Sequence, residues 1–486
     1  MNSLDVPSLG SKTLMGLIPV TIGSLFLYCM NTSKKKKLEE ALEYPPVAPV
    51  GTLQWIKARS CPDYPLQFLQ WCRDMDSPVY RLKTLLYDMV LTDDIHLFRQ
   101  ILKDKETYKP TEEYDVLKVI HDGGEDIVCS EGVFWKHSRK AIAPAFSSSH
   151  LKRMTETVKR KTDDFIKSRL DPMSEKGESI DICKELVDLT LSIISEAAFE
   201  YEMSHDEKEV IINGFALTLK EGIKCMVFPL RSRFGKYIFP EAKKAHLFSL
   251  KLIELGENIL NFYRDMDNPT KGTVIDQIAQ NTNYNSDKER VSDILVMIFA
   301  GHDTTGYSLS WILLELAKKP HELRLLRNEL RSHPEEERSS LKILRNVVKE
   351  GLRLQPVTPM QLRVVNKDII YRRDEHSKGI LIAKGRQVIC SNFLLCRNEK
   401  YFKDADDFVP SRWDDASDDA IAVVTPFSIG RRNCVGQSLA MVELHCVLAR
   451  LCSDYDFSVA DEGVPTFHVS WKPAGARLNA KRYGKG

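Results

Sequence analysis

The chain has almost no net charge. Its 486 residues include 69 lysines and arginines against 68 aspartates and glutamates, and 43% of them are hydrophobic. A balanced charge excludes the strongly basic composition of most nucleic-acid-binding domains, so we expect no nucleic-acid partner. The hydrophobic fraction is that of a folded protein with a large core.

Closely spaced cysteine pairs are also missing. The 11 cysteines are odd in number and scattered along the sequence. This argues against a disulfide scaffold and indicates a reducing compartment around most of the chain. No Gly/Ser-rich linker, low-complexity tract or internal repeat interrupts residues 51–486. We therefore expect these residues to fold as one large unit.

Charge is absent from a 17-residue apolar run at residues 14–30, and four lysines follow at residues 34–37. The run is at the short end of the roughly 17–25 residues that a spanning helix needs. Basic residues after it hold that side in the cytosol. We predict a lumenal segment at 1–13, a membrane anchor at 14–30, and a basic stop with a proline-rich hinge at 31–50. A cleaved signal peptide fits poorly because the charge follows the run, whereas an interfacial segment stays open.

Apolar residues recur at helical spacing in several long segments. These segments are residues 149–170, 180–199, 242–266 and 286–318. The last would be about 50 Å long at 1.5 Å per residue, and its middle is apolar on all sides, which implies burial. Strand-like segments lie at 79–82, 89–91, 363–370 and 379–389. These patterns predict a mainly α architecture with small β-sheets and one long central helix.

One cysteine has an unusual setting, in the sequence FSIGRRNCVG at residues 427–436. An apolar segment of helical period, residues 437–451, follows it. Cys434 should lie at a helix N-terminus, where the helix dipole lowers the pKa of a thiol. With no second cysteine or histidine cluster nearby, a single thiolate is typical of an axial ligand on a prosthetic group. A buried structural cysteine is the alternative.

The pattern Phe-x-x-Gly-x-Arg-x-Cys-x-Gly resembles the haem-binding signature of the cytochrome P450 family. A second stretch, AGHDTT at residues 300–305, resembles the oxygen-activation signature of that family. Other family motifs match at Trp135-x-x-x-Arg139, Glu350-x-x-Arg353 and Phe408-x-Pro410-x-Arg412. The resemblance covers residues 45–475. It implies the cytochrome P450 fold, in which a long central helix lies over a haem in a helix-rich domain with a minor β region.

The resemblance also implies the cofactor and the residues around it. The cofactor would be thiolate-ligated haem b, with Cys434 as the iron ligand and O2 as co-substrate. Positions implied to contact the haem are Trp135, Arg139, Ala300, Arg363, Phe427, Gly430, Arg432 and Gly436. Arginine suits the haem propionates because it donates bidentate, charge-assisted hydrogen bonds. Glu350, Arg353 and Arg412 would form a structural network beneath the haem.

Asp303 and Thr304 are implied to be the catalytic acid and hydroxyl that relay protons on the other face of the haem. Taken alone, Thr304 can compete for a backbone carbonyl within its helix. The alternative is that Asp303 faces solvent and Thr304 packs as a β-branched residue. We expect His302 to be a surface histidine or a satisfied core histidine rather than a ligand.

The implied function is a monooxygenase that inserts one oxygen atom into a lipophilic substrate by hydroxylation or epoxidation. A fatty acid, sterol, terpenoid or carotenoid would fit. Because the chain has no flavin or dinucleotide domain, electrons would come from a separate NADPH-cytochrome reductase, with cytochrome b5 as an additional candidate. Lys136, Lys140, Lys152 and Arg431 would supply positive charge to the docking face.

The expected location is the endoplasmic reticulum membrane, with residues 51–486 as a cytosolic haem-thiolate catalytic domain. An organelle envelope is the alternative. The apolar stretch 223–240 would be an entrance loop that dips into the membrane, with ordinary packing under a long loop as the other reading.

The sequence departs from the family pattern in two places. Ala300 stands where many fatty-acid hydroxylases carry a glutamate, which argues against hydroxylation at a terminal carbon. Cys396-Arg397-Asn398 replaces the usual His-Arg-Asp. Two other functions stay open: a reductase-independent isomerase or dehydratase of lipid hydroperoxides, whose members typically lack the acid–alcohol pair, and a non-catalytic haem-binding protein.

Overall fold

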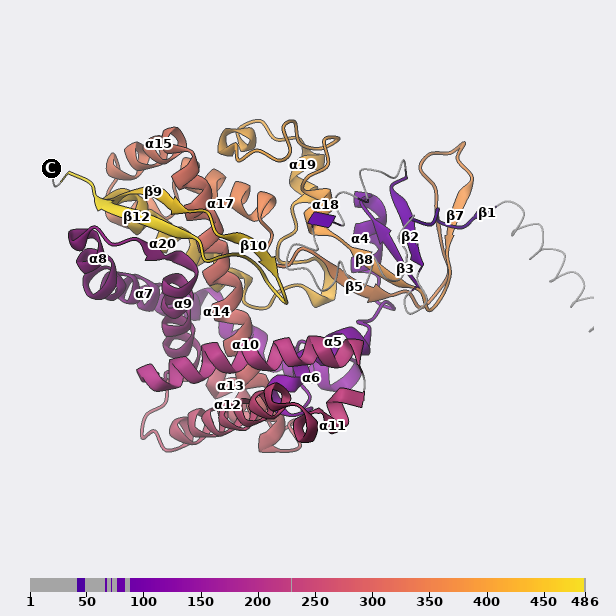
Figure 1. The fold of residues 1–486 in the computed structure, drawn as a ribbon, viewed down its shortest axis with the longest axis horizontal. Helices are drawn as coiled ribbons and strands as arrows, with labels where there is room; N and C mark the ends of the chain where they lie inside the picture. The colour runs from indigo at the N-terminus through magenta and orange to yellow at the C-terminus, as the bar shows by residue number, and fades with distance from the viewer. Residues whose placement is uncertain are drawn as a thin grey trace, which may run out of the picture.

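The computed structural model describes residues 42–48, 66–67, 71, 77–83, 88–228 and 230–484. Helices dominate these residues, and twelve short strands among them form four small sheets. Figure 1 shows the helices grouped around a long central helix, with strands β1, β2, β3, β7 and β8 gathered at one side. The prediction of a mainly helical fold with small sheets is confirmed.

The predicted anchor at 14–30 lies outside the described residues, as do residues 1–13, 31–41 and 49–50. Within the described ranges, we find no helix that is both long and apolar enough to cross a membrane.

The predicted central helix is α14 (Asp287–Lys318). It begins where the hydroxyl of Ser286 accepts a hydrogen bond from the Glu289 amide at 3.4 Å, an N-cap that satisfies a free helix N–H. It ends just before Pro320, which opens α15 (Pro320–Arg331). Gly301 lies against α9, since a Cβ at this position would be 2.7 Å from Ile194. The glycine therefore lets two helices approach closely.

The other helices surround α14 and account for most of the remaining chain (Figure 1). In chain order they are α4 (Ile95–Lys103), α5 (Thr111–Lys118), η1 (Val119–His121), α6 (Gly132–Ile142), η2 (Ala143–Phe146), α7 (Ser148–Phe165), η3 (Ile166–Leu170), α8 (Asp171–Lys176), α9 (Ile182–Phe199), α10 (His205–Val227), α11 (Leu230–Ile238), α12 (Pro240–Arg264), α13 (Val274–Gln280), α16 (Glu335–Arg338), α17 (Lys342–Leu354), α18 (Asn392–Leu395), η4 (Pro410–Trp413), α19 (Asp418–Val423), η5 (Gly430–Arg432) and α20 (Gln437–Asp454). The helices predicted at 149–170, 180–199, 242–266 and 437–451 are confirmed as α7 with η3, α9, α12 and α20.

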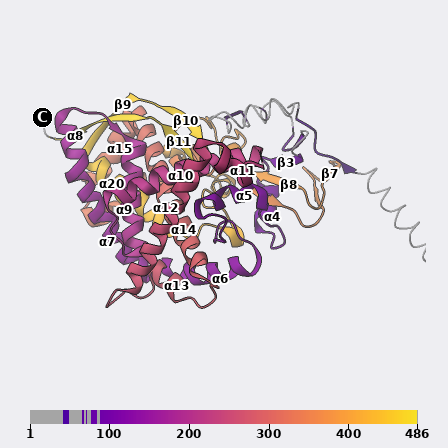
Figure 2. The ribbon, with the colours of Figure 1, turned by 60° about the horizontal axis from the view of Figure 1, so that its bottom comes forward.

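The four sheets join distant parts of the chain. The largest has the order β2 (Val79–Lys83), β3 (Asp88–Thr92), β8 (Gln387–Cys390), β5 (Gln361–Val364), and the second has the order β1 (Leu42–Glu43), β7 (Gly379–Ile382), β6 (Ile369–Tyr371). The third has the order β4 (Ile180–Asp181), β12 (Arg477–Arg482), β9 (Tyr455–Asp461), and the last pairs β10 (Val464–Phe467) with β11 (Trp471–Ala474). Figure 2 shows β9 and β10 on the opposite side of the helical body from α6 and α13.

Two strand predictions are wrong in extent. The segments 363–370 and 379–389 each form two strands that belong to different sheets. The chain leaves the first sheet after Val365, whose amide donates to the Arg386 carbonyl at 3.1 Å. The Asp368 carboxylate then accepts the Lys384 amide at 2.7 Å. These contacts join the two segments to each other where each of them leaves its first sheet.

The loop predicted at 223–240 is mostly helical. α10 continues to Val227, α11 spans Leu230–Ile238, and α12 begins at Pro240. Proline suits the first position of a helix because its missing N–H would be unpaired there. The segment therefore forms the short helix α11 between two long helices, and this helix exposes Leu230, Tyr237 and Ile238.

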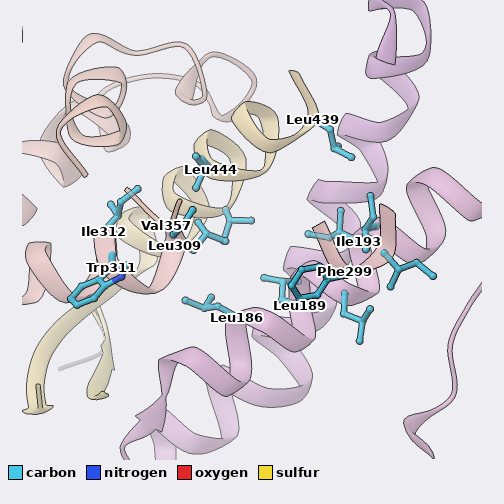
Figure 3. Close-up of a cluster of buried hydrophobic side chains, with 14 of the residues drawn as sticks. Leu186, Leu189, Ile193, Phe299, Leu309, Trp311, Ile312, Val357, Leu439 and Leu444 are labelled. Atoms are coloured by element: carbon cyan, nitrogen blue, oxygen red, sulfur yellow. The ribbon is translucent and has the colours of Figure 1, made fainter. Parts of the chain in front are cut away.

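The core forms where α9, α14 and α20 meet. Figure 3 shows Leu186, Leu189 and Ile193 of α9, with Phe299 of α14 and Leu439 of α20, gathered in one buried cluster. Fully burying such a side chain contributes roughly 1.5–3 kcal/mol. Further along α14, Trp311 stacks on Trp471 of β11 with ring centroids 5.8 Å apart. Its indole N–H donates to the Trp471 carbonyl at 3.0 Å, which fixes the C-terminal hairpin to the central helix.

Candidate active site

A cavity of about 320 Å³ lies between α14 and the segment that leads into α20. Most of the residues predicted for the site line it. These are Trp135, Arg139, Ala300, Thr304, Arg363, Phe427, Arg432, Cys434 and Gly436. Asp303, Gly430, Glu350, Arg353 and Arg412 do not line it. The folded chain thus brings residues from three separate motifs, together with Arg363, to one cavity.

Cys434 is held by the turn that precedes α20. Its amide donates to the Phe427 carbonyl at 2.8 Å, and its side chain is open to the cavity. The expected low thiol pKa is not found. Removal from bulk water raises the pKa of Cys434, while a hydrogen bond from the Gly436 amide and the charge of Arg139 lower it less. A coordinating metal would remove the proton outright.

Gly430 does not face the cavity but allows the backbone turn that precedes Cys434. Its φ is +78°, a left-handed conformation that favours glycine. A Cβ at this position would overlap the carbonyl oxygen of Leu102 at the end of α4. The turn therefore packs closely on α4 and places the following residues, Arg432 and Cys434, at the cavity.

Four cationic side chains line the cavity: Lys109, Arg139, Arg363 and Arg432. Arg139 donates to the backbone and side-chain oxygens of Asn433 at 2.6 and 2.7 Å. Arg432 pairs with Glu131 at 2.6 Å. Its Nε and Nη1 atoms are buried and have no partner among the described residues.

Lys109 was missed by the sequence analysis, because it belongs to no motif and lies in the short connection between α4 and α5. Its ammonium group donates to the Val128 carbonyl at 2.7 Å. Burial, with the charges of Arg363 and Arg432, lowers the pKa of Lys109 to about 7. The lysine is thus poised to gain its charge when an anion arrives.

The charge of the cavity fits a haem. Among the described residues that line it, the one acid is Glu443, and burial raises the pKa of that carboxyl well above its ordinary value. The wall is therefore positive, with guanidinium N–H groups that lack acceptors. Two carboxylates, as on haem b, would satisfy them by charge-assisted hydrogen bonds.

The opposite wall comes from α14. The Thr304 hydroxyl lines the cavity and donates to the Ala300 carbonyl at 2.8 Å, as its residue type predicts. Asp303 points elsewhere: its carboxylate accepts a hydrogen bond from Ser470 in the β10–β11 turn. The predicted acid and hydroxyl are therefore neighbours in sequence that face different surroundings. His302 is buried and its Nδ1 bonds to the Ile298 carbonyl at 2.7 Å, as a satisfied core histidine.

The predicted ion network assembles away from the cavity wall. Glu350 and Arg353 form two hydrogen bonds of 2.9 Å each and are both fully buried. Arg412 reaches the same carboxylate at 2.9 Å, and the indole of Trp413 does so at 3.0 Å. The Cys396 carbonyl accepts a bond from Arg353 at 2.6 Å.

The unusual Cys396-Arg397-Asn398 sequence has a structural role in this region. The Arg397 guanidinium lies 3.8 Å from the centre of the Phe393 ring. Asn398 donates to the Asp93 carboxylate at 3.3 Å. Arg397 and Asn398 thus fix the loop whose backbone carbonyl supports Arg353.

Comparison with known proteins agrees with this arrangement. The family model for cytochrome P450 matches residues 43–483. The chain is 25% identical to "Cytochrome P450 4d8" of Drosophila melanogaster over 76% of this chain and 86% of that protein. It is 26% identical to "Cytokinin hydroxylase" of Arabidopsis thaliana over 70% and 67%, and 28% identical to "Cytochrome P450 52C2" of Candida maltosa over 68% and 70%. The chain belongs to the cytochrome P450 family of monooxygenases, which use thiolate-ligated haem b and O2.

Proposed function

We propose that this chain is a membrane-attached monooxygenase of a lipophilic substrate, with Cys434 as the haem ligand. The observation that carries the proposal is a single cysteine open to a cavity whose rim is cationic and whose facing wall carries the Thr304 hydroxyl. When bound, the haem supplies activation of O2 and delivery of one oxygen atom to the substrate. The protein supplies binding, orientation and protons.

The cationic wall would hold the haem propionates. Arg139, Arg363 and Arg432 present fixed N–H groups, and Lys109 adds a charge that the bound carboxylates would stabilise. This binding would be directional, because one guanidinium group can donate two hydrogen bonds to the two oxygens of one carboxylate. This wall would set the orientation of the ring between Thr304 and Cys434.

Thr304 and Asp303 would transfer protons to the cavity. The Thr304 Oγ1 atom is on the cavity wall and can exchange its bond with the Ala300 carbonyl for one with a water molecule. Asp303 would act as the acid behind it, supplied from the hairpin through Ser470. The presence of this pair favours oxygen insertion over isomerisation of a lipid hydroperoxide.

The remaining lining supports a lipophilic substrate. Apolar side chains from α9, α14 and the loop before α6 cover much of the wall, including Ile127, Val128, Ile194 and Met297. A fatty acid, sterol, terpenoid or carotenoid would bury its hydrocarbon there.

Electrons would arrive on the side of Cys434, from an NADPH-cytochrome reductase or cytochrome b5. Lys136, Lys140 and Lys152 are exposed on α6 and α7, and Arg431 is half-buried and donates to the Thr107 carbonyl at 3.1 Å. The three lysines therefore form the better candidate surface for an acidic partner.

Attachment to the endoplasmic reticulum membrane would use the predicted anchor and a second, apolar surface. On and beside α11, several large apolar side chains are exposed. They are Phe228, Leu230, Phe234, Tyr237, Ile238 and Phe239. A short helix of this kind, whose basic residues are Arg231, Arg233 and Lys236, suits a bilayer interface.

Deleting residues 1–37 should give a haem-loaded protein that binds phospholipid vesicles more weakly than the full chain. Adding Leu230→Ser and Ile238→Ser should remove most of the remaining binding, as measured by vesicle flotation. Haem loss on deletion would contradict the assignment of those residues as an anchor separate from the catalytic fold.

The experiment that tests the proposal is the carbon monoxide difference spectrum of the reduced protein. Wild type should show the strongly red-shifted Soret band of a thiolate-ligated haem, and Cys434→Ala should lose it. A red-shifted band that survives in Cys434→Ala would show that another residue is the ligand.

Thr304→Ala should keep haem and substrate binding but release reducing equivalents as hydrogen peroxide, because the hydroxyl on the cavity wall is lost. Thr304→Ser, which retains the hydroxyl, is the matched control. Coupled turnover by Thr304→Ala would refute the role given to this hydroxyl.

A further inference from the structure

The segment between η1 and α6, residues 122–131, is an irregular strap that crosses one wall of the cavity. It begins with two left-handed residues, Asp122 and Gly123, and contains no α-helical turn. Ile127 and Val128 at its middle line the cavity. The position of the strap therefore decides how much room is left beside the haem site.

A single acid on α14 holds the middle of the strap. Asp293 is fully buried, with 0% of its surface exposed. One carboxylate oxygen accepts the Ile127 amide at 2.6 Å, and the other accepts the Tyr284 hydroxyl. Asp293 lies at the start of the apolar stretch of the helix. A carboxylate in such surroundings is costly, and the contact it makes is with the strap.

The strap is stiff on either side of this contact. The Asp126 carboxylate accepts the Val128 and Cys129 amides at 2.6 and 2.8 Å. It also bonds to His121 at 2.9 Å. These bonds close the turn that carries Ile127 and Val128, so the two side chains move together as one unit.

The far end of the strap is tied to the loop of Cys434. The Ser130 carbonyl accepts a bond from Arg432 at 2.5 Å, and Glu131 pairs with the same guanidinium. The strap is thus bonded at its middle to the central helix through Asp293 and at its far end to the loop of Cys434 through Arg432.

We propose that Asp293 is a positioning residue that fixes the strap and thereby limits the size of ligand the cavity admits. It acts through the Ile127 amide and touches neither haem nor substrate. The size limit rests on the proposed function, because it is read through a haem ligand; the positioning of the strap does not.

Hydrogen exchange on the haem-loaded, full-length wild type tests the positioning alone. The Ile127 amide should exchange as slowly as buried amides of α14, although it lies in an irregular segment. Exchange at the rate of an unstructured peptide would overturn the proposal. This measurement needs no variant and no assumption about the function.

Asp293→Ala should speed exchange at Ile127 by roughly tenfold, the loss expected when a buried amide is left without its acceptor. Asp293→Asn keeps an acceptor oxygen for this amide and is the matched control. Tyr284→Phe removes the other partner and should leave the Ile127 amide protected. Equal protection in Asp293→Ala and wild type would refute the proposal.

The size limit is tested with azoles that shift the Soret band when they bind haem iron. In Asp293→Ala, clotrimazole should associate several-fold faster than in wild type, whereas the association rate of imidazole should be unchanged. Equal changes for both ligands would refute the size limit. A protein without the carbon monoxide band described above would refute the proposed function while leaving the exchange result intact.

Discussion

The buried arginines of this protein fall into two groups, a closed group represented by Arg353 and an open group represented by Arg432. The groups differ in whether the chain itself pairs the N–H groups of the arginine. Arg353 donates to the Glu350 carboxylate and to three backbone carbonyls, so its charge and its N–H groups are satisfied within the chain. Arg432 is also buried, yet two of its nitrogens lack a partner among the described residues. Burial without partners is unfavourable. The closed group stabilises the fold, and we propose that the open group keeps its unpaired N–H groups for an anion.

The largest effect should come from disturbing the closed group. Arg353→Lys keeps the charge but cannot make the five hydrogen bonds of the guanidinium. Breaking a buried ion pair of this kind typically costs about 3–5 kcal/mol, so the urea midpoint of unfolding should drop sharply. Arg345→Lys on the exposed face of the same helix is the control, and it should behave as wild type. A normal midpoint for Arg353→Lys would remove the contrast between the two groups.

The same substitution in the open group should change binding and leave folding nearly intact. Arg432→Lys should weaken retention of haem by roughly tenfold, since about 1.5–3 kcal/mol is expected for hydrogen bonds to a charged group. Transfer of haem to excess apomyoglobin would measure it. Arg431→Lys is the neighbouring control because Arg431 does not line the cavity. If the urea midpoint fell as far as in Arg353→Lys, the open group would be structural as well.

The smallest expected effect is the change of haem affinity with pH. Lys109 has a pKa of about 7, lowered by burial and by Arg363 and Arg432, against about 10.4 in water. Bound propionates would favour the charged form, so haem binding takes up a proton above pH 7. Affinity should then fall with rising pH, by roughly fivefold between pH 7 and 8.

Lys109→Met should remove this part of the pH dependence, whereas Lys105→Met, at an exposed position, should retain it. The equilibrium partition of haem with apomyoglobin at each pH is the measurement. A pH profile of Lys109→Met that matches wild type would contradict the role of this lysine.

The sequence predicts features that depend on local signals. Ser286 and Pro320 mark the ends of α14, and the spacing around Cys434 brings it to the cavity. The long helices follow from apolar periodicity, which reports burial on one face. The ion network follows from the family resemblance of its motifs, since helical spacing alone predicts only the pair of Glu350 and Arg353, one turn apart.

Features set by distant partners are not predicted. The break between β5 and β6 depends on a carbonyl of Arg386, and Asp293 gains its role from an amide in another segment. The pKa of the Cys434 thiol was predicted in the wrong direction, because the tertiary fold removes it from water more than the helix end favours its charge. Lys109 acquires its low pKa from the same kind of burial.

Two contacts near the cavity join distant stretches of the chain. Ser470 meets Asp303 across 167 residues, and Arg432 meets Ser130 across 302. Contacts this distant form slowly, because a long loop must close before they contribute. During synthesis the strap and the central helix leave the ribosome long before Cys434 and the C-terminal hairpin do. The cavity therefore has no complete wall until the residues around Cys434 have been made, and we expect haem capture to follow the synthesis of that segment.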